Sequence, residues 1–234
     1  MSEIHQLRIQ SERTALESVH RDFHLEKLKW ARDQSWKAFH EIKNSIQEGM
    51  TERQAFELST EILKSTGAHK SWHKAFVRFG AGTRLSFRDP LQEAYKLQKG
   101  DAAYIDLGPV WTDPETEIEY EGDVGDSFVF GTNAVAEECA QDARQLFTQA
   151  QTEWKNRKLS GSEIYEFLKK AAAQKSYVLA DEVEGHRISD FPHHKYSKER
   201  LSKLSFDPTP MLWVLEVHIL HPQENLGAFY EDIM

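Results

Sequence analysis

The spacing of apolar residues near the start of the chain predicts two amphipathic helices. Between residues 25 and 46, one buried face is marked at mostly three- and four-residue steps by Leu28, Ala31, Trp36, Phe39, Ile42 and Ile46. Gly49 is expected to end this helix, because glycine readily adopts the left-handed conformation common after helix C-termini. Thr51 opens the second helix through a capping box with Gln54, and Gly67 ends it.

Strand-like and helical segments then alternate in a pattern that folds back on itself. Apolar runs bounded by turn residues predict strands at residues 75–79, 102–107, 126–130, 177–180, 212–220 and 228–233. One helix is expected over residues 133–154, and a second runs from the capping box of Ser160 and Glu163 to residue 173. The order predicts an α+β fold in which two pairs of helices cover the outer face of a curved, mostly antiparallel sheet. This single domain is expected to span residues 25–234, after an N-terminal extension of residues 1–24.

Composition indicates a folded, acidic protein. Hydrophobic residues make up 39% of the chain, and the net charge of −9 argues against nucleic acid or an anionic membrane as a partner. The polar N-terminus lacks the apolar core of a signal peptide, and no run of about 18 apolar residues occurs. The cytoplasm is therefore the expected location. The one cysteine, Cys139, cannot form an internal disulfide, and we interpret it as a small buried hydrophobe rather than a nucleophile.

Four carboxylates lie in short apolar or glycine-flanked segments, where an unpaired charge is costly to bury. They are Asp106, Asp123, Glu216 and Glu231. Asp126 is a rival for the role of Asp123, because it lies only three residues further on. Each acid alone could face water at a strand end or pair with a buried cation of the protein. Taken together, the four acids indicate a site for divalent cations.

Two histidines add nitrogen donors to this set. His186 and His193 lie seven residues apart around an irregular segment that contains Pro192, which suggests one ligand and one substrate-facing donor. Four carboxylates and His186 suit a pair of Mn²⁺, Co²⁺, Fe²⁺ or Zn²⁺ ions. Such a pair, about 3.5–4 Å apart, can hold a hydroxide between the ions and polarise a scissile carbonyl. The sequence therefore predicts hydrolysis at a centre of two divalent metal ions.

The order and context of these residues resemble the pita-bread metallopeptidases, which include methionine aminopeptidase, aminopeptidase P, prolidase and creatinase. The resemblance runs from about Lys27 to the end of the chain, and it includes the segments 49–52 and 97–101. Ser127, Phe128 and Gly131 fall where the family has Asp-x-Thr-x-Thr-Phe-x-x-Gly after its second metal aspartate. This likeness implies the pita-bread fold.

The resemblance also implies roles for individual residues. Two divalent ions would be held by Asp106, Asp123, His186, Glu216 and Glu231. Glu216 would double as the general base beside the metal-bound water. His193 would hydrogen-bond the substrate carbonyl or the tetrahedral intermediate.

The sequence departs from the family pattern at several positions. The family usually has a further histidine ahead of its first aspartate, whereas residues 86–90 contain none. The motif Gly-His-Gly-Ile-Gly has Arg187 in place of its second glycine. Because residues two apart on a strand face the same side, His218 is expected to project toward the metals with Glu216. We therefore predict that His218 or Arg88 supplies the missing donor; alternatively, His218 supports a ligand from behind or faces solvent.

By this resemblance, the chain is expected to be an aminopeptidase or dipeptidase-like hydrolase that acts on a small peptide or peptide-like substrate. One alternative is a creatinase-like enzyme acting on a small non-peptide C–N bond. The other is a non-catalytic binding protein of the same fold. Trp72 and Trp111 permit a homodimer without requiring one. We interpret Trp72 and His73 as part of a buried hydrophobic cluster, with a pocket-lining role as the alternative.

Overall fold

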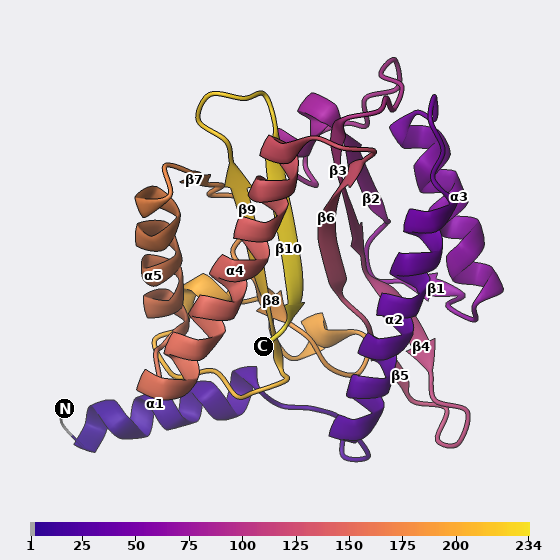
Figure 1. Cartoon of the computed structure of the whole chain (residues 1–234). Helices are drawn as coiled ribbons and strands as arrows, with labels where there is room; N and C mark the ends of the chain where they lie inside the picture. Colours follow the sequence, from indigo (N-terminus) through magenta and orange to yellow (C-terminus); the bar gives the residue numbers. More distant parts are fainter. Residues whose placement is uncertain (1–2) are drawn as a thin grey trace.

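A seven-stranded antiparallel sheet forms the centre of the computed structural model, which describes residues 3–234, with side chains from residue 10 onward (Figure 1). The path across this sheet runs through β2 (Phe76–Phe79), β3 (Asp101–Leu107), β6 (Val124–Phe130), β10 (Gly227–Ile233), β9 (Trp213–Leu220) and β7 (Val178–Leu179), with β8 (His186–Arg187) beside β9. A smaller antiparallel sheet consists of β1 (Lys70–Ser71), β4 (Pro109–Thr112) and β5 (Glu119–Glu121). The segment between Asp106 and Asp123 therefore forms a hairpin, β4–β5, which pairs with β1 in the second sheet.

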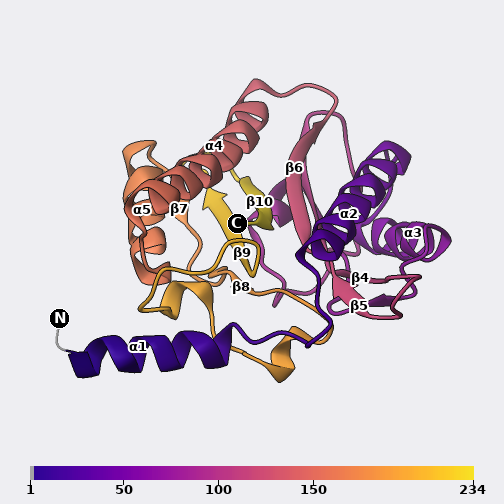
Figure 2. The same cartoon turned by 90° about the horizontal axis from the view of Figure 1, so that it is seen from below.

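Two pairs of helices cover one face of the large sheet (Figure 2). The first pair is α2 (Leu25–Ser45) and α3 (Glu52–Ser65), which pack on β2, β3 and β6. The second pair is α4 (Ala134–Arg157) and α5 (Gly161–Gln174), of which α4 packs on β6, β9 and β10. None of the helices in the described part of the chain combines the length and the apolar character that crossing a membrane requires.

Strict alternation along the strands divides apolar from polar side chains. On β3, Ala103, Ile105 and Leu107 join the core under the helices, which leaves Asp106 on the opposite face. On β9, Leu215, Val217 and Ile219 do the same, which leaves Glu216 on that opposite face. The carboxylates therefore gather on the face of the sheet that the helix pairs leave free.

The expected α+β architecture is confirmed, and so are both capping boxes, at Thr51 and at Ser160. The first long helix ends at Ser45 rather than at Gly49, which instead takes a left-handed φ of 84° in the following turn. One further helix, α1 (Glu3–Leu16), was not predicted, because the polar N-terminal segment shows no clear apolar stripe. Short connecting 3-10 turns complete the chain at residues Gly80–Arg84, His193–Lys195 and Leu201–Lys203.

Segment 16–24, which joins α1 to α2, is anchored to the region around β8 and β9. The guanidinium group of Arg187 is fully buried and donates hydrogen bonds to the carbonyl oxygens of Leu16 and Ser18. The side chain of Glu17 accepts a hydrogen bond from the indole of Trp213. The segment therefore packs directly behind the strand that carries His186.

Candidate metal centre

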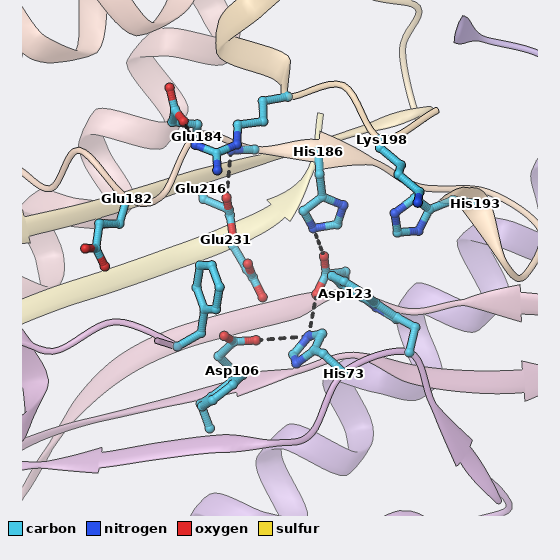
Figure 3. Close-up of a pocket in the computed structure, with 15 residues that line it drawn as sticks. His73, Asp106, Asp123, Glu182, Glu184, His186, His193, Lys198, Glu216 and Glu231 are labelled. Atoms are coloured by element: carbon cyan, nitrogen blue, oxygen red, sulfur yellow. Dashed lines mark hydrogen bonds and ion pairs between the residues drawn. The ribbon is translucent and has the colours of Figure 1, made fainter. Parts of the chain in front are cut away.

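Strand register places three of the predicted acids in one row across the sheet. Glu216 on β9 lies directly opposite Glu231 on β10, which in turn lies opposite Gly125 on β6. Gly125 lies opposite Asp106 on β3. Asp123 comes two residues before Gly125 and turns its carboxylate toward the same cavity (Figure 3). Like charges on directly opposed residues repel each other, so this row requires cations or protons between the acids.

The rival acid, Asp126, lies on the other face of the sheet. Its carboxylate pairs with Arg144 of α4, at 2.8 Å and 3.0 Å from Nε. Alternation along β6 explains the difference, because Asp126 is an odd number of residues from Asp123 and from Gly125. The choice between the two aspartates is therefore settled in favour of Asp123 as the residue that lines the cavity.

His186 faces Asp123 from the far side of the cavity. Its Nε2 lies 2.7 Å from Asp123 Oδ2, and its Nδ1 lies 2.7 Å from the carbonyl oxygen of Arg187. A carbonyl oxygen only accepts, so Nδ1 carries the proton and Nε2 is directed at the carboxylate. Glu216 is held in turn by the backbone N–H of Gly185, which donates to its Oε2 at 2.6 Å. Both side chains are thus oriented from behind, as metal ligands usually are.

Two of the buried oxygens, Asp106 Oδ1 and Glu231 Oε1, have no hydrogen bond within the described part of the chain. A third, Asp123 Oδ2, has only the ring nitrogen of His186 beside it. Glu231 is 1% exposed, as is the side chain of Asp123. Buried polar atoms are rarely left without a partner. These orphaned oxygens point into the space between the strands, which fits a set of ligands for hard divalent cations.

Charge crowding shifts the pKa values of these acids in opposite directions. Burial, reinforced by the charges of Asp123 and Glu216, raises the pKa of Asp106 to about 7. Burial and the neighbouring carboxylates raise the pKa of Glu231 well above its ordinary value. Burial alone would raise the pKa of Asp123 too, but the neighbouring imidazoles, above all that of His186, lower it to about 2. These acids therefore cannot all carry a negative charge at neutral pH unless cations lie between them.

His73 belongs to this centre, although the sequence pattern favoured a buried hydrophobic cluster for it. Its Nε2 lies 3.4 Å from Asp106 Oδ1 and 3.5 Å from Asp123 Oδ1. Burial would lower the pKa of His73, but the charges of Asp106 and Asp123 outweigh that effect and raise it to about 9. Trp72 beside it packs against the rings of His73, His186 and His193 with centroid distances of 4.2, 4.7 and 5.2 Å. The alternative interpretation, that both residues line a pocket, is the one that the structure supports.

His193 reaches the cavity with a buried carboxylate behind it. Glu121, which is fully buried on β5, accepts hydrogen bonds from the backbone N–H of His193 at 2.9 Å and from its Nδ1 at 2.7 Å. This leaves Nε2 as the ring atom that faces the cavity. No sequence pattern indicated Glu121, because it lies 72 positions from His193.

His218 and Arg88 are not brought to the cavity. His218 is 2% exposed and its Nε2 lies 2.8 Å from the carbonyl oxygen of Thr83, between the rings of Tyr104 and Phe229. It shares a strand face with Glu216, as expected, but an aromatic layer separates it from the acids. Arg88 lies over the ring of Phe87 at 5.4 Å from its centroid.

The cavity around the acids has a volume of about 320 Å³. Trp72, Phe76 and Phe87 form its apolar wall, and Phe87 is 46% exposed at the mouth. Charged side chains form the rest of the rim: Glu182, Glu184, Lys198 and Arg200. Glu184 pairs with Arg200, and Glu182 accepts a hydrogen bond from Ser86. The cavity can therefore enclose a small molecule that has both apolar and polar parts.

Comparison with known proteins agrees with this geometry. A model of metallopeptidase family M24 matches residues 26–234. No curated protein matches the sequence significantly. The solved structures that resemble the chain include an X-Pro aminopeptidase from Thermotoga maritima. The two sequences are 18% identical, the TM-score is 0.67, and the match covers 89% of this chain and 56% of the aminopeptidase.

Two further structures are similar. A prolidase from Pyrococcus furiosus is 17% identical with a TM-score of 0.67, and the match covers 87% of this chain and 58% of that one. A methionine aminopeptidase from Thermotoga maritima is 15% identical with a TM-score of 0.63, and the match covers 89% of this chain and 91% of that one. The chain thus spans little more than half the length of the X-Pro aminopeptidase and the prolidase. Because the family model covers most of the sequence, the chain belongs to metallopeptidase family M24 and has its pita-bread fold.

Proposed function

We propose that this protein is a hydrolase that uses two divalent metal ions to cleave a peptide or peptide-like C–N bond in a small substrate. The observation that carries the proposal is the row of carboxylates across the neighbouring strands β3, β6, β10 and β9, with buried oxygens that lack hydrogen bonds aimed into one cavity. The ligands would be Asp106, Asp123, His186, Glu216 and Glu231. When bound, such a pair supplies an activated water molecule and polarises the scissile carbonyl.

The protein's own groups would bind the substrate and move its protons. Glu216 has one oxygen held by Gly185, and burial raises its pKa. Its other oxygen would serve as the general base. His193 is fixed by Glu121 with Nε2 toward the cavity, where it can contact the substrate carbonyl. The aromatic wall of Trp72, Phe76 and Phe87 would hold an apolar substrate side chain and exclude water.

Metal analysis of the purified protein tests the proposal first. We expect two divalent ions per chain after supply of Mn²⁺, Co²⁺, Fe²⁺ or Zn²⁺, and their loss in an Asp106→Ala variant. Asp22→Ala is the matched control, because that aspartate side chain is 54% exposed at the surface. No bound metal in the wild type under any of these supplies would refute the metal centre and favour a non-catalytic binding protein of the same fold.

A panel of substrates then distinguishes the peptidase from the creatinase-like alternative. Hydrolysis of dipeptides or short peptides by the metal-loaded protein, absent in the Asp106→Ala variant, would support the peptidase. Turnover of small non-peptide amides or amidines alone would replace it with the creatinase-like alternative. The cytoplasmic location and the homodimer stay predictions from the sequence.

A further inference from the structure

His73 approaches the acids from the segment between β1 and β2, opposite His186 (Figure 3). Its Nδ1 lies 2.7 Å from the carbonyl oxygen of Lys74. Because that carbonyl only accepts, Nδ1 carries the proton, and Nε2 is left to face Asp106 Oδ1 and Asp123 Oδ1. A nitrogen lone pair aimed at two carboxylate oxygens is repulsive, so either a proton on Nε2 or a metal ion must lie between them.

The arrangement repeats that of His186. Both imidazoles hold Nδ1 at 2.7 Å from the carbonyl oxygen of the following residue, and both direct Nε2 at Asp123. They face different oxygens of this carboxylate, Oδ1 for His73 and Oδ2 for His186. A histidine that ligates a metal typically donates its other N–H to a backbone carbonyl or a carboxylate in this way.

The distances at His73 are longer than those of a direct ion pair and leave room for a metal ion. Hydrogen bonds between an imidazolium and a carboxylate are about 2.7–2.9 Å long. The separations of 3.4 and 3.5 Å at His73 are clearly longer. When two ligand atoms each lie about 2.1 Å from one metal ion and the angle between the two bonds is about 90–110°, the ligand atoms are about 3.0–3.4 Å apart. Three possible ligand atoms lie within 4.8 Å of one another: a nitrogen of His73 and one carboxylate oxygen from each of Asp106 and Asp123. Asp106 Oδ1 makes no hydrogen bond within residues 3–234.

We propose that His73 is a sixth protein ligand of the metal centre, holding one ion together with Asp106 and Asp123. His186, Glu216 and Glu231 would complete the set of ligands. This inference rests on the proposed metal centre and deepens it. A second imidazole favours zinc or iron over manganese, because nitrogen donors suit those ions better.

Close packing holds His73 in this position. Its ring stacks on Phe76 at 5.7 Å and meets Trp72 edge-on. Gly108 lies against the same ring, and a Cβ atom there would collide with the His73 imidazole and with the Trp72 indole. Gly108→Ala should therefore displace His73 without removing any carboxylate.

Titration of the metal-free protein with Co²⁺ tests the proposal. The wild type should bind two ions, whereas His73→Ala should keep one and bind the second at least about tenfold more weakly. Gly108→Ala should change in the same direction, and His69→Ala, an exposed histidine four residues away, should behave as the wild type. Free imidazole added to His73→Ala should restore binding of the second ion, which separates loss of a ligand from loss of the fold.

Proton NMR of the Co²⁺-loaded protein gives a second readout. Each ligating imidazole contributes one exchangeable, strongly shifted N–H signal, so we expect two signals in the wild type and one in His73→Ala. Two ions of wild-type affinity in His73→Ala would overturn the proposal, even if turnover were lost, since His73 would then act on substrate instead. A wild type that binds no ion at all would refute the proposed metal centre itself, and the role of His73 with it.

Discussion

Replacing His218 with glutamine should make the protein less sensitive to acid, because this imidazole is buried and uncharged in the fold. His218 is 2% exposed, and its Nε2 contacts the carbonyl oxygen of Thr83 at 2.8 Å. Burial lowers the pKa of His218 from 6.5 to about 4. Glutamine keeps an N–H donor for the Thr83 carbonyl but does not titrate, so His218→Gln isolates the effect of protonation.

The sign and the size of the effect follow from that pKa. The unfolded chain binds a proton on His218 as the pH falls below about 6.5, whereas the folded protein binds it only near pH 4. Stability contributed by neutral His218 is therefore complete above about pH 6.5 and is lost as the pH falls toward 4. Each unit of pKa shift corresponds to about 1.4 kcal/mol, so the wild type should lose about 2.5 kcal/mol more than His218→Gln between about pH 7.5 and about pH 4.5.

Urea unfolding followed by tryptophan fluorescence measures this difference. Both proteins are first treated with a chelator, so that competition between protons and metal ions does not contribute. All other groups titrate alike in the two proteins, and their effects cancel in the difference. Free energies of unfolding that fall in parallel would refute the argument.

Three further predictions concern groups around the centre. Glu121→Gln should lower kcat by about 10–100-fold with little change in KM, because His193 loses the carboxylate that orients its ring. Steady-state kinetics with a dipeptide substrate measure this effect, and an unchanged kcat would contradict the prediction. Glu52→Gln should cost about 3–5 kcal/mol in urea unfolding, since it leaves the fully buried Arg78 without its charge partner. The exposed Glu93→Gln should cost less than about 1 kcal/mol, and equal costs would refute the argument. Removing metal by chelation should lower the free energy of unfolding by about 3 kcal/mol, compared with protein in a free metal concentration of about 100 times the Kd. An unchanged urea midpoint would argue against tight binding.

Much of the fold and most of the centre could be predicted because their signals are local. Glu216 and Glu231 each interrupt an apolar strand, so the alternation that defines the strand also indicates which face carries the charge. The predicted strand ends agree with the observed ones to within one or two residues, as for residues 212–220 against Trp213–Leu220. Register then brings these two acids directly opposite each other, which makes the row across the sheet a consequence of strand pairing.

The positions that sequence reasoning missed depend on contacts between distant segments. His73 is 50 residues from Asp123 and lies in the loop between β1 and β2. The pairing of β1 with β4 and of β2 with β3 brings this loop beside the acids, which the sequence pattern does not show. Glu121 lies on a short strand of the second sheet, which the sequence pattern did not reveal. Asp126 and Asp123 were alternatives because the exact phase of β6 decides which of them faces Arg144 of α4.

Two departures from the family pattern have physical explanations in this chain. Arg187 occupies the place of a glycine beside His186, and its buried guanidinium binds the carbonyl oxygens of Leu16 and Ser18. A larger residue is tolerated there because the segment before α2 supplies the partners for its charge. The histidine expected near Arg88 is absent, and the imidazole that lies beside Asp106 and Asp123 comes from a different segment, at His73. Both departures are therefore compatible with a metal centre, because the charge of Arg187 has its own buried partners and an imidazole still lies beside the carboxylates.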